Sequence, residues 1–242
     1  MSGSIQLNAD LGEGAQVEDL LMPHLSFCNI ACGGHYGDET SMRDALESAL
    51  KYGVKIGAHP SYPDQENFGR VVMDISLEDL EDAIMSQLMD FKNVCRSAGA
   101  PIHHVKAHGA LYHQIIIDRT LREVFLKIVY LVLGDVKIML PSHVCAKDLH
   151  LDRSDIIYEA FGDRRYTDHL RLLPRSEKDA VLHYSEEIEN QIANLIKEGK
   201  VVSNSGRSHS IQFDTICLHG DHQQLKTYFP ILIQNLKDKG LL

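Results

Sequence analysis

IHHVKAHGALYH, residues 102–113, has the form of the end of a buried β-strand that is followed by a glycine turn. Successive side chains of a strand point to opposite sides, so His104, Lys106 and His108 share one face and His103 lies on the other. Because burying even one unpaired charge costs several kcal/mol, the first face is not ordinary core. We expect it to belong to a polar site at the strand end, with Lys106 and His108 as the foremost candidates and His104 deeper in a supporting place.

Similar strand-like runs alternate with helical patterns along the rest of the chain, where apolar residues recur at spacings of three and four. This alternation is typical of βαβ units with parallel strands. The predicted strands span residues 5–10, 27–32, 54–59, 102–108, 136–140, 155–161, 200–203 and 214–219. The predicted helices follow Thr40, run from a Ser76 cap to Gly99, and occupy about 118–133, 178–198 and 222–238, with Pro230 expected to kink or delay the last.

Seven or eight such units in 242 residues predict an α/β fold with one domain, residues 1–242. We expect an irregular seven- or eight-stranded (β/α) barrel, and a doubly wound open sheet is the structural alternative. In both folds, sites assemble at the carboxyl ends of the strands, where loops and helix N-termini converge.

Composition narrows the class of protein. The chain has 34 acidic and 24 basic residues, a net charge of −10, and no basic block, so we expect no nucleic-acid partner. We also expect no membrane association and a cytoplasmic location, because no apolar run approaches the ~20 residues of a membrane span and the first residues do not resemble a signal peptide. The five cysteines form no CxxC pair, which fits a reducing compartment, and Cys28 and Cys32 are interpreted as packing residues.

Polar side chains recur where the predicted strands end. These residues are Asp10, His35, Asp38, His59, His108, Asp163, Arg164 and His219. Each of them alone has an ordinary structural explanation, but so many strand ends that supply an acid or a histidine predict one shared site.

Common nucleotide and hydrolase motifs are missing from the chain. There is no GxxxxGK[ST] phosphate loop, no complete GxGxxG, no GxSxG and no HExxH. Any nucleotide must therefore be bound without these devices.

Seven segments resemble, in the same order, motifs of the LamB/YcsF family. They are LNADLGEG (7–14), NIACGGHYGDE (29–39), IGAHPSYPD (56–64) followed by FGR (68–70), HVKAHGALYH (104–113), EAFGDRRY (159–166), LLPR (172–175) and ICLHGD (216–221). The resemblance runs from about residue 5 to the C-terminus. It implies a (β/α) barrel of the glycoside hydrolase/deacetylase type. It also implies a hydrolase acting on a cyclic amide: ATP-dependent opening of 5-oxo-L-proline to L-glutamate, with two partner subunits, B and C.

The chain departs from the family's usual motifs in three places. CGGHYGD stands where the family has CGFHAGD, NFGRV where it has GFGRR, and VKAHGALYH where it has VKPHGALYN. These departures alter the expected shape of the pocket. The departing residues are Gly34, Tyr36, Asn67, Val71, Ala107 and His113.

Histidines and carboxylates in one site suit general acid/base catalysis or a divalent metal that activates water. The expected catalytic set is Asp10, Glu13, His35, Asp38, His59, His108, Asp163 and His219, and the candidate metal ligands are Asp10, His35, His59 and His108. In our hypothesis, Asp10 or Asp163 is the base toward water, or ligates a metal that activates it, and His108 or His59 protonates the leaving ring nitrogen.

Three cations are predicted to bind substrate. Arg70 and Lys106 are expected to hold a substrate carboxylate or a phosphoryl oxygen. Arg164 is the third candidate, with pairing to Asp163 or a neighbouring acid as the other interpretation.

Three functions remain open from the sequence. The first is the lactam-opening subunit that works with subunits B and C, with ATP as a co-substrate bound by this chain or by a partner. The second is a free-standing metal-dependent amidohydrolase or carbohydrate deacetylase, and the third is a non-catalytic regulatory subunit.

Overall fold

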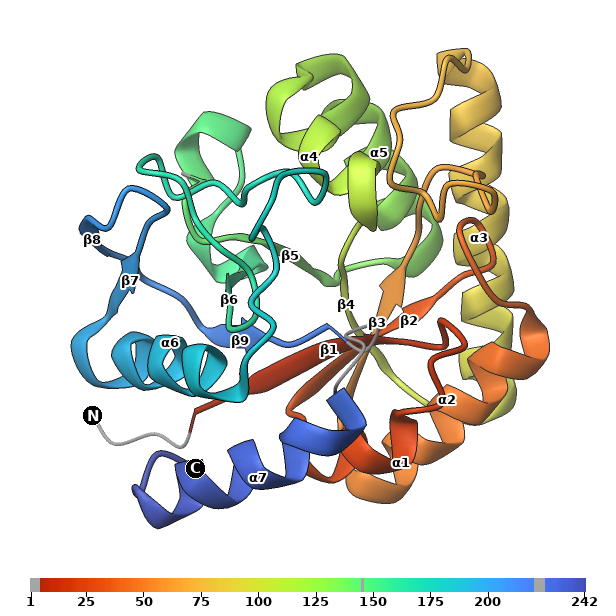
Figure 1. Ribbon diagram of the computed structural model, residues 1–242. Helices are drawn as coiled ribbons and strands as arrows, with labels where there is room; N and C mark the ends of the chain where they lie inside the picture. Colours follow the sequence, from red (N-terminus) through yellow and green to blue (C-terminus); the bar gives the residue numbers. More distant parts are fainter. Residues whose placement is uncertain (1–4, 145, 220–224) are drawn as a thin grey trace.

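The computed structural model describes residues 5–144, 146–219 and 225–242, and its centre is a closed barrel of seven parallel strands (Figure 1). The strands follow one another around the barrel in sequence order, and the last pairs with the first, which excludes the open-sheet alternative. They are β1 (Leu7–Leu11), β2 (Phe27–Ala31), β3 (Lys55–His59), β4 (Ile102–Val105), β5 (Lys137–Pro141), β6 (Ile156–Phe161) and β9 (Thr215–Cys217).

The seventh of the eight predicted strands, 200–203, does not join the barrel. Its residues form β7 (Lys200–Val202), which pairs antiparallel with β8 (Ser208–Ser210) in a separate two-stranded sheet. β7 buries its central residue alone, whereas the strands of a parallel barrel are covered on both faces. The Ser-Asn-Ser-Gly turn at residues 203–206 lets β7 pair locally with the segment that follows it.

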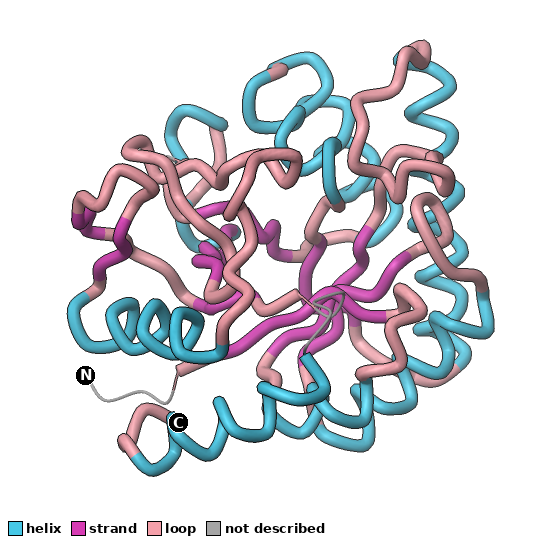
Figure 2. Tube along the Cα trace, in the orientation of Figure 1, coloured by secondary structure: helices cyan, strands magenta, loops and turns pink. Residues whose placement is uncertain are grey.

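Helices surround the barrel and bury their apolar faces against it (Figure 2). They are α1 (Glu18–Leu21), α2 (Glu39–Tyr52), α3 (Leu77–Ser97), α4 (Gly109–Ile117), α5 (Arg119–Leu133), α6 (Ser185–Glu198) and α7 (Leu225–Asp238). Short 3₁₀ turns span Met22–His24, Ala146–Leu149 and Arg153–Asp155. Among the described residues, no helix combines the length and the apolar character of a membrane span.

The helix boundaries follow local signals. Ser76 caps α3 as predicted, because its side chain accepts a hydrogen bond from the backbone of Asp79. The segment 178–184, predicted as helix, precedes α6 and is not helical. Pro230 lies inside α7 and does not delay its start, while the predicted helical residues 222–224 lie outside the described part of the chain.

The interior of the barrel is polar rather than purely apolar. Asn29, Gly57 and His104 lie in register on adjacent strands, and all are buried. A Cβ atom at Gly57 would lie 2.3 Å from Nε2 of His104, so the glycine provides the space for the imidazole. His104 Nε2 donates a hydrogen bond to Oδ1 of Asn29 at 2.7 Å. Asn29 in turn donates to Asp10, so these polar side chains connect the middle of the barrel to the strand ends.

Candidate active site

A cavity of about 860 Å³ opens at the carboxyl ends of the barrel strands. Most of the predicted site residues line it, as the convergence of parallel strands requires. They are Asp10, Glu13, His59, Arg70, Lys106, His108, Arg164 and His219.

Three histidines and one glutamate form a buried cluster at one side of this cavity. Glu13, His35, His59 and His108 each offer one ligand atom, and these atoms lie within 4.8 Å of one another. Glu13 Oε1 is 2.9 Å from Nε2 of His35 and 3.3 Å from Nδ1 of His108. The rings of His35 and His108 stack in parallel with their centroids 3.6 Å apart.

Hydrogen bonds to the backbone define which ring nitrogens of this cluster carry protons. His59 Nδ1 donates to the carbonyl oxygen of Lys106 at 2.7 Å, and His108 Nε2 donates to that of Phe68 at 3.0 Å. In a neutral imidazole the other ring nitrogen carries no proton and presents a lone pair. Those two nitrogens, His59 Nε2 and His108 Nδ1, face each other at 2.9 Å, which requires a shared proton or a cation between them.

The electrostatics of the cluster favour a cation other than a proton. Burial, together with the neighbouring charges of His59 and His35, holds the pKa of His108 well below its ordinary value. Burial also lowers the pKa of His35, against the effect of Glu13. Neutral imidazoles and a carboxylate are the ligands that a divalent transition metal takes, so these four residues fit such an ion. Three of the predicted ligands thus lie together with Glu13, while the fourth, Asp10, lies beside them with Oδ2 3.4 Å from Nε2 of His59.

Lys106 lies beside this cluster, between two carboxylates. Its Nζ is 3.0 Å from Oδ1 of Asp10 and 3.0 Å from Oε2 of Glu159, and 3.4 Å from Sγ of Cys217. Burial disfavours the charged amine, but the nearby acids outweigh it and raise the pKa of Lys106 well above its usual range. Because two carboxylates already neutralise this ammonium, the structure does not support the predicted role of Lys106 in holding a substrate anion.

Both oxygens of Asp10 have partners, and Oδ2, which Lys106 Nζ approaches at 3.3 Å, is the one that faces the histidine cluster. Its Oδ1 accepts hydrogen bonds from Lys106 and from Nδ2 of Asn29, the latter at 2.8 Å. Its Oδ2 lies 3.4 Å from Nε2 of His59. Burial raises the pKa of Asp10, but His59 and Lys106 lower it further, so the carboxylate stays ionised with a pKa well below its ordinary value.

Asp163 and His219 form a dyad. Asp163 Oδ1 is 2.9 Å from Nδ1 of His219, and Oδ2 accepts the backbone N–H of His219 at 2.7 Å. Burial would raise the pKa of Asp163, but His219 overcomes it and lowers that pKa far below its usual range. The carboxylate therefore fixes Nδ1 as the protonated nitrogen and leaves Nε2 of His219 for the cavity that this residue lines.

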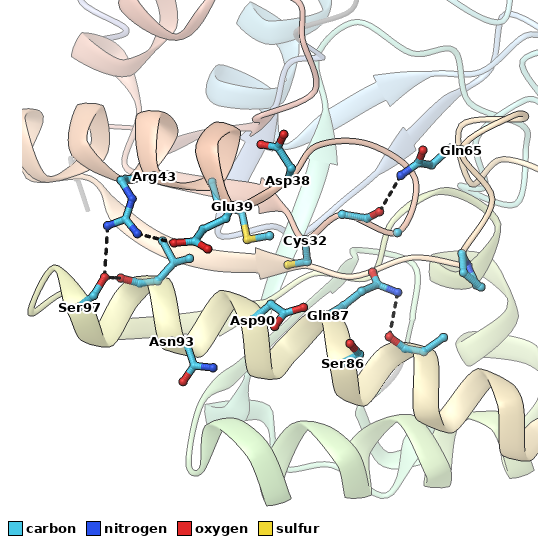
Figure 3. Close-up of a pocket in the computed structure, with 16 residues that line it drawn as sticks. Cys32, Asp38, Glu39, Arg43, Gln65, Ser86, Gln87, Asp90, Asn93 and Ser97 are labelled. Atoms are coloured by element: carbon cyan, nitrogen blue, oxygen red, sulfur yellow. Dashed lines mark hydrogen bonds and ion pairs between the residues drawn. The ribbon is translucent and has the colours of Figure 1, made fainter.

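Asp38 does not reach this site, contrary to the prediction. It is the N-cap of α2, where its carboxylate accepts the backbone N–H of Ser41 at 3.0 Å. It lines a different cavity of about 700 Å³ between α2 and α3 (Figure 3). An acid that follows a strand and an acid that caps the next helix lie in the same part of the sequence, because a short loop joins β2 to α2.

Sequence reasoning left out two side chains of the site floor. Asn29 bridges Asp10 and His104, and Glu159 is fully buried, where it accepts a hydrogen bond from Tyr112 at 2.5 Å. The available signal was a single polar residue inside each of the apolar strands FCNIAC and IIYEAF. Cys28 and Cys32 are buried free thiols, consistent with packing roles.

The two predicted arginines both line the cavity. Arg70 places its guanidinium over the ring of Phe68, 4.7 Å from the centroid. Arg164 is buried and donates to the carbonyl oxygens of Leu173 and Ala180 at 2.6 and 3.3 Å.

Known proteins share this architecture and sequence. The A subunit of 5-oxoprolinase from Haemophilus influenzae strain PittEE is 36% identical over 234 residues, covering 96% of both chains. The crystal structure of the lactam utilization protein of Thermus thermophilus superposes with a TM-score of 0.84 at 28% identity, covering 98% of each chain. A family 4 carbohydrate esterase of Streptomyces lividans, at 13% identity, shares the fold alone, with a TM-score of 0.52 over 99% of this chain and 90% of its own.

The fold and the resemblance expected from the seven motifs are thus both confirmed. The model of the LamB/YcsF family matches residues 5–241, a range that contains every residue of the cavity described above. This chain belongs to the LamB/YcsF family.

Proposed function

We propose that this chain is the A subunit of a 5-oxoprolinase. With subunits B and C it would open the lactam ring of 5-oxo-L-proline to L-glutamate, with ATP as the co-substrate of the complex. The observation that carries the proposal is the similarity of relatives with that name along 96% of the chain. The buried acids and histidines at the barrel mouth supply the groups that amide hydrolysis needs.

Ring opening adds water to the lactam carbonyl, breaks the C–N bond and delivers a proton to the ring nitrogen. Asp10 is the better base of the two candidates, because its Oδ2 faces the cluster while both oxygens of Asp163 are bound to His219. The proton donor assigned from the sequence changes for a similar reason. The N–H groups of His59 and His108 are bonded to backbone carbonyls, whereas Nε2 of His219 is left for the cavity. The proposed donor is therefore His219 in its doubly protonated form, with Nδ1–H held by Asp163; Nε2 gives its proton to the ring nitrogen and is reprotonated from solvent.

The proposed metal ligands are Glu13, His35, His59 and His108. The opposed lone pairs of His59 and His108 support this assignment, since a cation resolves their close approach. A divalent ion held there would act as a Lewis acid toward a carbonyl oxygen.

The decisive experiment reconstitutes the complex from this chain, its partner subunits, 5-oxo-L-proline and ATP, and measures glutamate and ADP with each component omitted in turn. We expect glutamate to form when all are present. Glutamate formation by this chain without ATP or partners would instead support a free-standing amidohydrolase, especially if a chelator abolished it.

Variants test the assignment of the catalytic groups in the same assay. Asp10→Asn and His219→Gln should lower the rate by about 10²–10⁴-fold, the usual contribution of a general acid or base. Asp90→Asn, at the second cavity, is the matched control and should retain the wild-type rate. Folded Asp10 and His219 variants with full turnover would favour a non-catalytic role.

A further inference from the structure

Carboxylates and guanidinium groups both line the catalytic cavity. The carboxylates are those of Asp10, Glu13 and Glu159, with Lys106 neutralised among them. Besides Arg70, three arginines from one segment line it, Arg164, Arg171 and Arg175, which we call the arginine wall. Such a concentration of guanidinium groups stands out in a chain whose net charge is −10.

The arginine wall is built on a hydrogen-bonded hairpin rather than on a loose loop. Tyr166 and Leu172 form an antiparallel bridge. Two backbone hydrogen bonds flank it: Thr167 N donates to the carbonyl of Arg171 at 2.7 Å, and Leu173 N donates to the carbonyl of Arg165 at 3.0 Å. A second bridge joins Arg164 to Val181. The backbone that carries Arg164 and Arg171 is therefore fixed before any ligand arrives.

Arg164 is held in the cavity lining by the backbone of the hairpin segment. Its side chain is 6% exposed, and two backbone carbonyls hold the guanidinium in the cavity lining. Among the described residues, Arg171 forms no ion pair, and its guanidinium is exposed at the cavity rim.

Neighbouring histidines respond to this positive charge. Burial and then Arg171 lower the pKa of His143 to about 4, and burial and then Arg164 lower the pKa of His113. Both imidazoles line the same cavity and are neutral near pH 7, so they add hydrogen-bonding capacity without a competing negative charge. The acids near these residues are Asp148, which also lines the cavity, and Asp163, which is bonded to His219 and whose pKa the charge of Arg175 also lowers.

We propose that the arginine wall is the subsite that binds the anionic group of the substrate, the carboxylate attached to the lactam ring. This assignment rests on the proposed function and extends it, because it orients the ring with its carbonyl toward Asp10 and the histidine cluster. A guanidinium matches a carboxylate with two parallel N–H···O bonds, which an ammonium cannot do. Arg171 and Arg175 are thereby added to Arg164 as substrate-binding residues, in place of Lys106.

The test compares two ligands that differ by the carboxylate alone. Dissociation constants for 5-oxo-L-proline and for 2-pyrrolidinone, the same lactam without the carboxylate, are measured calorimetrically on the purified chain and as KM values in the reconstituted complex. We expect the wild type to favour 5-oxo-L-proline by about tenfold or more. Arg171→Met and Arg175→Met should each reduce this preference several-fold, while affinity for 2-pyrrolidinone changes less than about twofold. Arg43→Met, at the second cavity, should leave both values unchanged.

Three outcomes would overturn the subsite. One is a wild-type chain with no preference for the carboxylate, alone or in the complex. Another is a pair of arginine variants that keep the wild-type preference. The third is arginine-dependent binding of inorganic phosphate that does not compete with 5-oxo-L-proline. The arginine wall would then bind a phosphoryl group rather than the carboxylate of the substrate.

Failure of the subsite differs from failure of the proposed function. Carboxylate-dependent binding at the wall, with no glutamate formed by the complete complex, retains the subsite and removes the proposed function. Glutamate formation with unchanged KM values in the arginine variants retains the proposed function and removes the subsite.

Discussion

Asn29 connects the floor of the cavity to the interior of the barrel. Its Nδ2 donates to Oδ1 of Asp10 at 2.8 Å and to Oδ1 of Asn8 at 3.1 Å, while its Oδ1 accepts from His104 at 2.7 Å. All four side chains are buried. One amide thus satisfies three polar partners, of which Asn8 and His104 are fully buried, and it helps to set the orientation of Asp10.

Replacing Asn29 by the similarly sized Leu should therefore destabilise the protein by about 2–4 kcal/mol, because Asp10, Asn8 and His104 each lose a partner in a buried place. Urea unfolding monitored by circular dichroism measures the change. Asn93→Leu, on the exposed face of α3, is the matched control and should cost less than about 1 kcal/mol. An Asn29→Leu protein as stable as the wild type would show that this network does not contribute.

At the scale of elements, the loop between β3 and α3 covers the histidine cluster. Phe68 has a left-handed backbone, with φ of 55°, and its carbonyl accepts the N–H of His108. Gly69 follows with φ of 63°, and a Cβ there would lie 2.9 Å from Cβ of His35 and 3.1 Å from Cδ2 of His108. The loop can approach both imidazoles this closely because residue 69 has no side chain.

Gly69→Ala should weaken metal binding by about 10–100-fold, since it pushes away the carbonyl that fixes the ring nitrogen of His108. Competition with a chelator for Zn²⁺ measures the affinity. Gly99→Ala is the control: Gly99 also has a positive φ of 67°, but an added Cβ meets nothing within 4 Å. Both variants should lose about 1 kcal/mol or more through the positive φ, and Gly69→Ala should lose more because of its contacts. Equal metal affinities of the two variants would contradict the role of the loop.

For the whole molecule, buried histidines make stability depend on pH. Several described histidines have a pKa below the ordinary value of 6.5, mainly because burial disfavours the charged ring; they are His24, His35, His103, His104, His108, His113 and His143. Between that value and the lowered one, the unfolded chain binds more protons than the folded chain. The free energy of unfolding therefore rises with pH in this window and falls on acidification.

We expect the metal-free protein to lose stability progressively from about pH 6.5 toward pH 4, the window of His143. Urea unfolding at a series of pH values after chelation measures the slope. His143→Gln removes one titrating ring and should flatten the slope, whereas His169→Gln, at an exposed position, should not. Stability that stays constant or rises across this window on acidification would contradict the burial of neutral histidines.

The sequence by itself determined the seven barrel strands, most of the helices around them and which strand faces are polar, but it extended α6 to 178–184 and did not predict α4. Alternation, apolar spacing and caps such as Ser76 are local properties, so the positions of Asp10, His59, His108 and His219 at strand ends followed from them. The motifs also indicated the family, because their order and spacing need no coordinates.

Tertiary structure alone decided which of these groups meet. Closure with seven strands excluded 200–203 from the barrel and depended on register between distant strands, which no local pattern encodes. The same closure placed Lys106 between Asp10 and Glu159, brought Glu13 from a loop to the histidines, and left Asp38 as a helix cap. A periodicity assigns a side chain to a face, whereas a site requires distances across the barrel, and those are set by how the strands pair and where each loop returns.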